Sequence, residues 1–359
     1  MAANSARFGK IKRKKFFIGG GALLLLIASV VSGSGCAFNA PAYRGPISGH
    51  FDGERFINPE GSSDKGFGSV LRWKLTSTAP AWEQRAVTPT KPEARLDAGL
   101  RATWVGHSTV LLQIDGMNIL TDPHWSERAS PVSFAGPRRV VAPGIAFDDL
   151  PRIDLVLISH NHYDHLDVPT LKRLWERDQP RMLTMLGNSA LLMQEGIPSS
   201  EDLDWWDVRT IGPGIQATAV PAKHFSARGI GDRDRTLWGG FVVEAPSATI
   251  WFSGDTAWTG DFAVIGQRFP RIDLALIAIG SYTPRWFMQE NHIDPAEAVR
   301  AQLATGAKTA IGVHWATFSM SDDGQDQPAQ DLASALREIP NPPDFRVLPI
   351  GGIYEIPAR

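Results

Sequence analysis

Apolar and polar positions follow a regular pattern only from about residue 100 onward. The run Ile153–Ser159 is almost entirely apolar, which is the pattern of a strand buried on both faces. Shorter apolar or alternating runs, bounded by glycine and polar residues, predict further strands. We expect these at Leu100–Val105, Thr109–Ile114, Asn118–Thr121, Met182–Leu186, Ile215–Val220, Gly239–Glu244, Thr249–Ser253, Leu274–Ala278, Thr309–Val313 and Phe345–Leu348.

Segments with helical features lie between these strands. Asp294 is a favourable residue to precede a helix, and Pro295 suits the first helical position. We expect helices at Val168–Arg177, Asn188–Glu195, Gly260–Gln267, Pro295–Ala304 and Ala329–Glu338. Many strands interleaved with helices predict an α/β sandwich.

The first 36 residues have the pattern of an export signal. The basic run Lys12–Lys15 precedes the apolar run Phe16–Val31, and small residues then lead to Cys36. The small residues and the cysteine are similar to the lipobox of bacterial lipoproteins, although Gly33 stands where a leucine-like residue is usual; an uncleaved signal anchor is the alternative. The basic end is expected to stay in the cytoplasm. Residues 1–36 therefore predict a leader or membrane anchor, with the rest of the chain on the periplasmic side of a bacterial cell envelope.

The next segment, residues 37–95, is rich in proline, glycine and serine and shows little periodicity. We expect it to be extended and to pack on the main domain, which comprises residues 96–359. Residues 76–95 have the composition of a loop or lid.

Composition narrows the possible functions. Hydrophobic residues make up 43% of the chain, enough for a large core, and the formal net charge is −2. A nucleic-acid partner is not expected, because such proteins carry a basic stripe along the fold. The only cysteine is Cys36, which excludes both a disulfide within the chain and a zinc site built on thiolates.

The densest group of chemically active residues directly follows the buried strand at Ile153–Ser159. It is Ser-His-Asn-His-Tyr-Asp-His-Leu-Asp, at Ser159–Asp167, and it holds three of the nine histidines of the chain. Imidazole and carboxylate groups are suitable ligands for zinc and related ions. A loop at the end of a strand can aim several of them into one cavity, whereas positions two apart on a helix face different ways. We predict that the ligands are His160, His162, Asp164 and His165.

This H-x-H-x-D-H motif after an apolar strand resembles that of the metallo-β-lactamase superfamily. Further pieces match in the right order, namely Thr121-Asp122-Pro123, Lys223-His224, Ser253-Gly254-Asp255-Thr256 and Val313-His314-Trp315. The resemblance covers the chain from about Leu100 to the C-terminus. It implies an α/β fold of four layers, an αββα sandwich, with metals at the edge of the two sheets.

The resemblance also implies a complete set of ligands. The first metal would be bound by His160, His162 and His224, and the second by Asp164, His165 and His314. Asp255 would bridge the two ions, and Asp122 would orient the ligands without binding a metal itself. Two zinc ions per chain are expected, although manganese and iron occur in similar sites.

Such a site predicts hydrolysis. Two neighbouring divalent ions lower the pKa of a shared water and neutralise charge on the scissile group, so that a metal-bridging hydroxide would be the nucleophile. Asp164 and Asp255 would then be catalytic residues as well as ligands. No cysteine is available as a nucleophile outside the leader, and no G-x-S-x-G motif stands out.

Other motifs resemble one branch of the superfamily, the N-acylphosphatidylethanolamine-hydrolysing phospholipases D. They are Gly106-His107-Ser108-Thr109, Leu120-Thr121-Asp122-Pro123 and the segment Glu290–Ala298. The resemblance implies that His292 contacts the phosphate of the substrate and acts in catalysis; the alternative is a histidine that only makes local hydrogen bonds near a helix start. The products would be phosphatidic acid and an N-acylethanolamine.

The same resemblance suggests residues that contact the lipid substrate and partners of the chain. Trp286 and Phe287 are candidates for an apolar lip that receives an acyl chain, although such aromatic residues more often pack in a core. A phospholipid substrate, a membrane surface and a second copy of the chain in a homodimer are the expected partners.

Three alternatives stay open. A lactonase of the ascorbate-6-phosphate lactonase type would use a similar metal motif to open a cyclic ester. A nuclease of the superfamily is disfavoured by the near-neutral charge. A non-catalytic envelope protein would use metal only to hold its fold, but structural zinc sites are closed by four protein ligands, whereas seven ligands shared by two ions leave positions open.

Overall fold

The computed structural model describes residues 38–61 and 65–358. The predicted leader at residues 1–36, with Cys36, lies outside this part of the chain. Among the described residues, none of the helices has the length and apolar character needed to span a bilayer.

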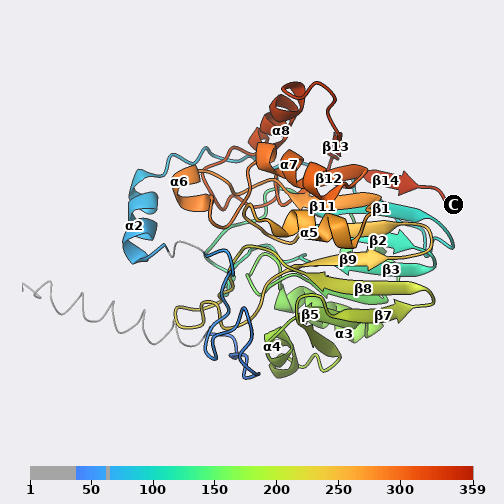
Figure 1. The fold of residues 1–359 in the computed structure, drawn as a ribbon, viewed down its shortest axis with the longest axis horizontal. Coiled ribbons are helices and arrows are strands. Elements are labelled where there is room, and N and C mark those ends of the chain that lie inside the picture. Colours follow the sequence, from blue (N-terminus) through green and yellow to red (C-terminus); the bar gives the residue numbers. More distant parts are fainter. Residues whose placement is uncertain (1–37, 62–64, 359) are drawn as a thin grey trace, which may run out of the picture.

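Two seven-stranded β-sheets pack face to face (Figure 1). The strand order is β14-β1-β2-β3-β4-β5-β6 in the first sheet and β13-β12-β11-β10-β9-β8-β7 in the second. The first sheet consists of β1 (Leu100–Gly106), β2 (Thr109–Ile114), β3 (Met117–Thr121), β4 (Leu155–Ile158), β5 (Arg181–Met185), β6 (Ser200–Leu203) and β14 (Ile353–Ile356). The second consists of β7 (Val208–Gly212), β8 (Ile215–Val220), β9 (Gly240–Glu244), β10 (Thr249–Phe252), β11 (Leu274–Ala278), β12 (Thr309–Val313) and β13 (Asp344–Arg346).

Helices cover the outer face of each sheet. The first sheet carries α3 (Val168–Asp178) and α4 (Asn188–Gln194), and the second carries α5 (Asp261–Arg268), α7 (Pro295–Thr305) and α8 (Gln327–Arg337). One buried apolar cluster lies between the sheets, and a further cluster lies under each helical layer. This arrangement is the expected four-layer αββα sandwich. The start of α7 is also as predicted, because the side chains of Asp294 and Glu297 form a reciprocal capping box.

The central strands bring the predicted site residues to one edge of the sandwich. β3, β4 and β5 pair in parallel in the first sheet, and β10, β11 and β12 do so in the second. In sheets of this kind, the loops at the carboxyl ends of the strands form the site. The loops that follow β3, β4, β10 and β12 contain Asp122, His160–His165, Asp255 and His314.

Two phenylalanines attach the segment that precedes the sandwich. Phe51 and Phe56 are each 1% exposed and belong to the cluster between the sheets. The backbone N–H of Tyr43 also donates to the carbonyl of Arg235 at 2.9 Å. Burial of a phenylalanine side chain stabilises a fold by about 1.5–3 kcal/mol, so these contacts fix residues 38–61 against the main domain.

Helix α2 (Phe67–Thr76) lies in the segment that we expected to be extended. It stands at the left of Figure 1, apart from the sandwich and beside α6 (Arg285–Met288), another helix that the pattern did not predict. Trp73 stacks on Phe287 with ring centroids 4.9 Å apart, and its indole N–H donates to Asp322 at 3.0 Å. These partners are distant in sequence, which is why local composition gave no indication of the helix.

The remaining differences lie at the edges of the sheets. β6, β7 and β14 were not predicted, and β13 ends two residues earlier than the expected strand Phe345–Leu348. Edge strands are half exposed, so their sequences need not be apolar: β6 is Ser-Glu-Asp-Leu, with only its leucine buried. Their pairing comes from the neighbouring strand rather than from their own pattern.

Candidate metal centre

The loop His160–His165 is fixed at both ends. It follows β4, whose four residues are all buried, and it leads into α3 through Asp167. The carboxylate of Asp167 accepts hydrogen bonds from the backbone N–H of Ser126, at 3.0 Å, and from its hydroxyl, at 2.7 Å. The loop therefore has little freedom to move its histidines.

Three histidines form a first group. Nε2 of His160 lies 2.8 Å from Nδ1 of His162, and Nε2 of His224 lies 3.3 Å from the same atom. His224 comes from the other sheet, after β8. Its Nδ1 lies 2.9 Å from the carbonyl oxygen of Asn291, which leaves Nε2 directed at the group. These are the three side chains that the sequence predicts for the first metal.

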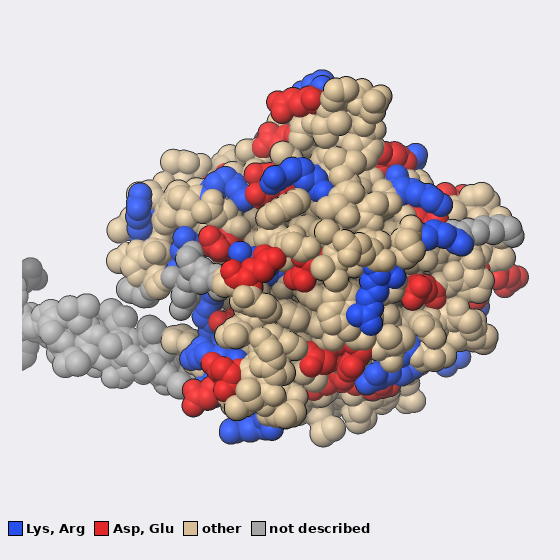
Figure 2. Space-filling view, viewed as in Figure 1, with Lys and Arg blue, Asp and Glu red and all other residues tan. Residues whose placement is uncertain are grey.

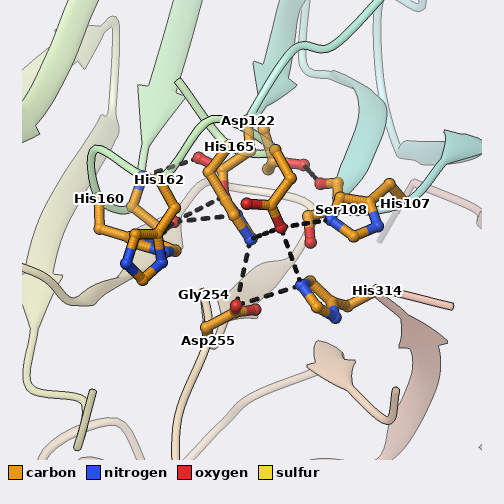
Figure 3. Close-up of polar contacts among 12 residues, drawn as sticks. His107, Ser108, Asp122, His160, His162, His165, Gly254, Asp255 and His314 are labelled. Atoms are coloured by element: carbon orange, nitrogen blue, oxygen red, sulfur yellow. Dashed lines mark hydrogen bonds and ion pairs between the residues drawn. The ribbon is translucent and has the colours of Figure 1, made fainter. Parts of the chain in front are cut away.

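A second group lies beside the first. Oδ2 of Asp164 is 3.0 Å from Nε2 of His165 and 3.3 Å from Nε2 of His314. Figure 3 shows His165 and His314 directed at the neighbouring carboxylate of Asp255. Asp164, His165 and His314 are the residues predicted for the second metal, and His314 again comes from the second sheet.

Asp255 lies between the two groups. Its Oδ2 is 3.1 Å from Nε2 of His314, 3.2 Å from Nε2 of His165 and 3.8 Å from Nε2 of His224. One carboxylate oxygen thus reaches ligand atoms of both groups, as a bridging ligand would.

Asp122 supports the site from behind. Its Oδ2 lies 2.6 Å from Nδ1 of His165 and accepts a hydrogen bond from the hydroxyl of Ser159, while its Oδ1 accepts from the backbone N–H of Ser159 at 2.7 Å. Asp122 is fully buried. Because a carboxylate only accepts, Nδ1 of His165 carries the proton and Nε2 is left to face the groups, which is the usual way that an outer carboxylate orients a metal ligand.

Charges in this buried centre compensate one another. Burial raises the pKa values of Asp164 and Asp255, but the surrounding histidines, His165 first among them, hold both well below their usual value. Burial lowers the pKa of His165, but Asp255, Asp164 and Asp122 outweigh it and raise that pKa well above its usual value. The acids are therefore ionised and attract positive charge into the space between them.

The histidines of the first group are held neutral. Burial lowers the pKa of His162 to about 3, and it lowers the pKa values of His160 and His224 well below their ordinary value. A neutral imidazole is the form that binds a metal.

The donor set fits a pair of transition-metal ions. His160, His162 and His224 form one group. Asp164, His165 and His314 form the other, with His107 beside them, and Asp255 lies between the two groups. Ligands about 2.0–2.1 Å from a tetrahedral ion lie about 3.3 Å from one another, close to most distances in both groups. Among the residues that the structure describes, Oδ1 of Asp255 is buried without a hydrogen-bond partner. Such atoms are rare unless another ligand satisfies them.

Strained backbone marks the same place. Asp122, with φ of 34°, and His314, with φ of 64°, are in the left-handed region although neither is glycine. Such conformations persist only where surrounding structure enforces them, and they cluster at functional sites. The fold thus holds both side chains in place at a conformational cost.

His292 lies at the open side of the centre. Its Nδ1 is 3.9 Å from Oδ2 of Asp255, and its side chain is 13% exposed. The backbone around it is anchored, because the N–H of Ile293 donates to Thr256 and Arg285 donates to the carbonyl of His292. Burial lowers the pKa of His292 to about 4, so it is neutral at pH 7.

A cavity of about 460 Å³ opens onto these residues. Its polar end is lined by His162, Asp164, Asp255, His292 and His314. Its other walls are mainly apolar and include Val70, Trp73, Phe287, Met288 and Met320. Of the two residues expected to form an apolar lip for an acyl chain, only Phe287 lines the cavity. Trp286 lies outside the lining, and the guanidinium of Arg72 is 4.6 Å from the centre of its ring.

Sequence reasoning missed two contributors. Ser159 was seen only as the start of the motif, yet its hydroxyl and N–H hold Asp122. His107 is named only within a motif that resembles the phospholipase D branch, yet its Nε2 lies 2.8 Å from Oδ2 of Asp164. Its position in the Gly106-His107-Ser108-Thr109 motif was the available signal.

Known proteins resemble this chain in sequence. Residues 117–315 match the family model described as "Beta-lactamase superfamily domain". The N-acyl-phosphatidylethanolamine-hydrolyzing phospholipase D 1 of Caenorhabditis elegans is 33% identical over 86% of this chain and 94% of its own length. An uncharacterized protein of Mycobacterium tuberculosis is 38% identical over 74% of this chain and 73% of its own length.

The fold has solved neighbours as well. The metallo hydrolase Igni18 of the archaeon Ignicoccus hospitalis superposes with a TM-score of 0.55 and 20% identity, over 73% of this chain and all of that structure. At this identity the likeness concerns the fold alone.

Proposed function

Because the chain belongs to the metallo-β-lactamase superfamily, and to the family that includes the worm N-acyl-phosphatidylethanolamine-hydrolyzing phospholipase D 1, we propose that it is a binuclear zinc phosphodiesterase that cleaves N-acylated ethanolamine phospholipids. That it is a metal-dependent hydrolase follows from the family. The two zinc ions, the phosphodiester and the lipid are the proposed parts.

The cavity at the metal centre is the observation that carries the proposal. Its polar end holds Asp255 and His292, and its apolar walls hold Trp73, Phe287 and Met288. A substrate that fills it needs an anionic group next to an apolar chain, as an N-acylated phospholipid has. A small cyclic ester would leave the apolar walls without a partner.

Each of the two ions would have its own set of ligands. His160, His162 and His224 would hold one ion, Asp164, His165 and His314 the other, and Asp255 both. Bound divalent ions activate water as a nucleophile and neutralise charge on a phosphoryl group. Zinc is proposed because the donors are nitrogen and oxygen atoms with several histidines, a set that zinc readily accepts.

His292 would contact the phosphate. Its imidazole is neutral and lies at the cavity wall close to Asp255. It therefore has one N–H to donate to a phosphoryl oxygen, where charge builds up as the bond to the alcohol breaks. Donors aimed at developing charge are worth about 10²–10³ in rate.

Helix α2 would place the cavity at a lipid surface. Val70, Leu71 and Leu75 are 37%, 47% and 77% exposed, and Arg72 and Lys74 lie among them. The helix contains no acidic residue, and its part of the surface, at the left of Figure 2, is mostly uncharged with isolated basic side chains. Exposed apolar residues beside basic ones are typical of helices that lie in a membrane interface.

The predicted leader supports the same location. Residues 1–36 would anchor the chain to a bacterial envelope membrane on the periplasmic side, so that α2 and the mouth of the cavity reach phospholipids of that bilayer. A homodimer is proposed only by analogy with the family.

A lipid panel in ¹⁸O-labelled water tests the reaction. Purified zinc-loaded protein is mixed with N-acylphosphatidylethanolamine, phosphatidylethanolamine, bis-p-nitrophenyl phosphate and a simple lactone, and products are identified by mass spectrometry. We expect phosphatidic acid carrying the label together with unlabelled N-acylethanolamine. Release of diacylglycerol, or turnover of the lactone alone, would contradict the proposal. Metal analysis of the purified chain should give two zinc ions per chain.

A further inference from the structure

We propose that His107 is a positioning residue that holds the carboxylate of Asp164 for the second metal by donating a hydrogen bond from Nε2 to Oδ2. This inference rests on the binuclear site of the proposed function. It adds a residue that is not among the seven ligands and comes from the turn between β1 and β2.

The contact itself is short and buried. Nε2 of His107 lies 2.8 Å from Oδ2 of Asp164, and the His107 residue is 1% exposed. An ionised carboxylate has no hydrogen to donate, so the imidazole is the donor. Nδ1 of His107 has no hydrogen-bond partner among the described residues, so the contact with Asp164 is the one polar contact that the ring makes there.

A potential ligand atom of His107 lies within 4.8 Å of those of Asp164, His165 and His314, but its contacts differ from theirs. His165 and His314 each direct Nε2 at two carboxylates, Asp164 and Asp255, as nitrogens bound to a shared ion would. His107 makes an ion-pair contact with Asp164, whereas no such contact joins it to Asp255 within the part of the chain that the structure describes. In Figure 3, dashed lines join Asp255 to His165 and His314 but not to His107.

The backbone of His107 is held as firmly as its ring. Its N–H donates to the hydroxyl of Thr317 at 2.8 Å, and its carbonyl accepts from the indole of Trp104 at 2.8 Å and from the N–H of His314 at 2.9 Å. The last bond joins a turn of the first sheet to a ligand residue of the second. With φ at 52°, His107 adopts the left-handed conformation that this turn requires.

These contacts allow His107 to restrain the side chain of Asp164. The backbone around Asp164 is held by a turn, in which the N–H groups of His165 and Leu166 donate to the carbonyl of His162. The turn does not fix the carboxylate, which can rotate about its terminal bond. The N–H of His107 restrains that rotation and keeps Oδ2 directed at His165 and His314. Loss of such an outer contact typically lowers metal affinity or activity by about 10–100-fold.

The chain offers a matched control in His124. This histidine is also 1% exposed, and its ring, like that of His107, makes an edge contact with Phe318, at 4.8 Å against 5.3 Å between centroids. Its Nδ1 faces Arg139 at 3.2 Å rather than a ligand. Nδ1 of His124 also lies 3.7 Å from Oδ2 of Asp167, but no hydrogen bond or ion pair joins its ring to any of the seven ligands within the described residues. His124→Leu therefore removes an imidazole of equal burial while leaving the contacts of the seven ligands intact.

Metal affinity at each site is the deciding measurement. Wild type, His107→Leu, His107→Gln and His124→Leu are loaded with zinc or cobalt, and the two dissociation constants are determined by chelator competition, with cobalt absorption reporting the geometry at each site. We expect His107→Leu to weaken only the second metal, by about 10–100-fold. His107→Gln, whose amide N–H can take the place of Nε2, should stay close to wild type, as should His124→Leu.

Other results would overturn the inference. Unchanged affinity in His107→Leu would show that the contact is not needed. Equal loss in His107→Gln and His107→Leu would make His107 a metal ligand instead. If His107→Leu does not fold, His107→Phe, whose ring has no N–H to donate, is compared with His107→Gln in its place. A wild-type chain that binds fewer than two ions would refute the proposed function itself, which separates that failure from this one.

Discussion

The metal centre and helix α2 line the same cavity, yet the fold holds them in different ways. Side chains of the centre are buried and tied from both sheets, as in the contacts of His165 with Asp122 and Asp255. Helix α2 has one buried side chain among those described, that of Trp73, and exposes Leu71 and Leu75. The centre is thus fixed for chemistry, whereas the helix keeps apolar surface available for a partner. Changes in the first region should impair metal binding or turnover, and changes in the second should alter only access of the lipid to the site.

The largest effect is expected from Asp255→Ala. Its Oδ2 reaches both groups of ligands, so its loss leaves the histidines without their shared partner. We expect bound zinc to fall below two ions per chain and turnover of N-acylphosphatidylethanolamine to fall to background, as measured by metal analysis and product formation. Asp148→Ala is the control, since the side chain of Asp148 is 95% exposed. An Asp255→Ala enzyme with two ions and normal turnover would refute the bridging role.

The next effect is expected from His292→Gln. The change removes the N–H proposed to contact the phosphate but leaves the seven ligands intact. We expect kcat to fall by about 10²–10³-fold while both metals are retained. The measurement is steady-state kinetics combined with metal analysis. Normal kcat would leave His292 with only its local backbone hydrogen bonds.

Asp122→Ala should have a smaller but still clear effect on the centre. His165 and Ser159 would lose the carboxylate that orients them. We expect the affinity for the second metal to drop by about 10–100-fold, with activity restored by excess zinc. Chelator competition measures the first effect and a zinc titration of activity the second. Activity that stays low at saturating zinc would mean that Asp122 does more than position a ligand.

The smallest effect on the reaction itself is expected from the double substitution Leu71→Ser, Leu75→Ser. Both side chains face solvent, so unfolding free energy should change by less than about 0.5 kcal/mol per site. We expect unchanged turnover of bis-p-nitrophenyl phosphate but weaker binding to phospholipid vesicles and slower hydrolysis of vesicle lipid. Vesicle flotation and the two activity assays test this. Met193→Ser is the control, because Met193 is 64% exposed on α4, on the outer face of the first sheet. Equal vesicle binding by the double variant and wild type would remove α2 as the lipid-facing element.

Comparison of the two regions also shows what the sequence could reveal. The buried strands could be predicted because a short apolar run is enough to indicate one. The loop after β4 could be predicted because His160, His162 and Asp164 follow such a run within a few residues. Helix α2 was not predicted, because the residue that attaches it, Trp73, stacks on Phe287 and donates a hydrogen bond to Asp322. Both partners lie more than 200 positions away in the sequence. The edge strands β6, β7 and β14 were missed for the same reason: a neighbouring strand defines them.

For the site, the sequence alone predicted the type of candidate ligand, since the order of histidines and aspartates along the chain matched a known pattern. Only the tertiary structure decided which nitrogen of each histidine faces the centre and that Oδ2 of Asp255 reaches both groups. It also decided that Phe287 but not Trp286 lines the cavity and that His107 contacts Asp164. A motif consists of a few consecutive residues and can be recognised from the sequence alone. A hydrogen bond between two sheets depends on how those sheets pack, which no short stretch of sequence contains.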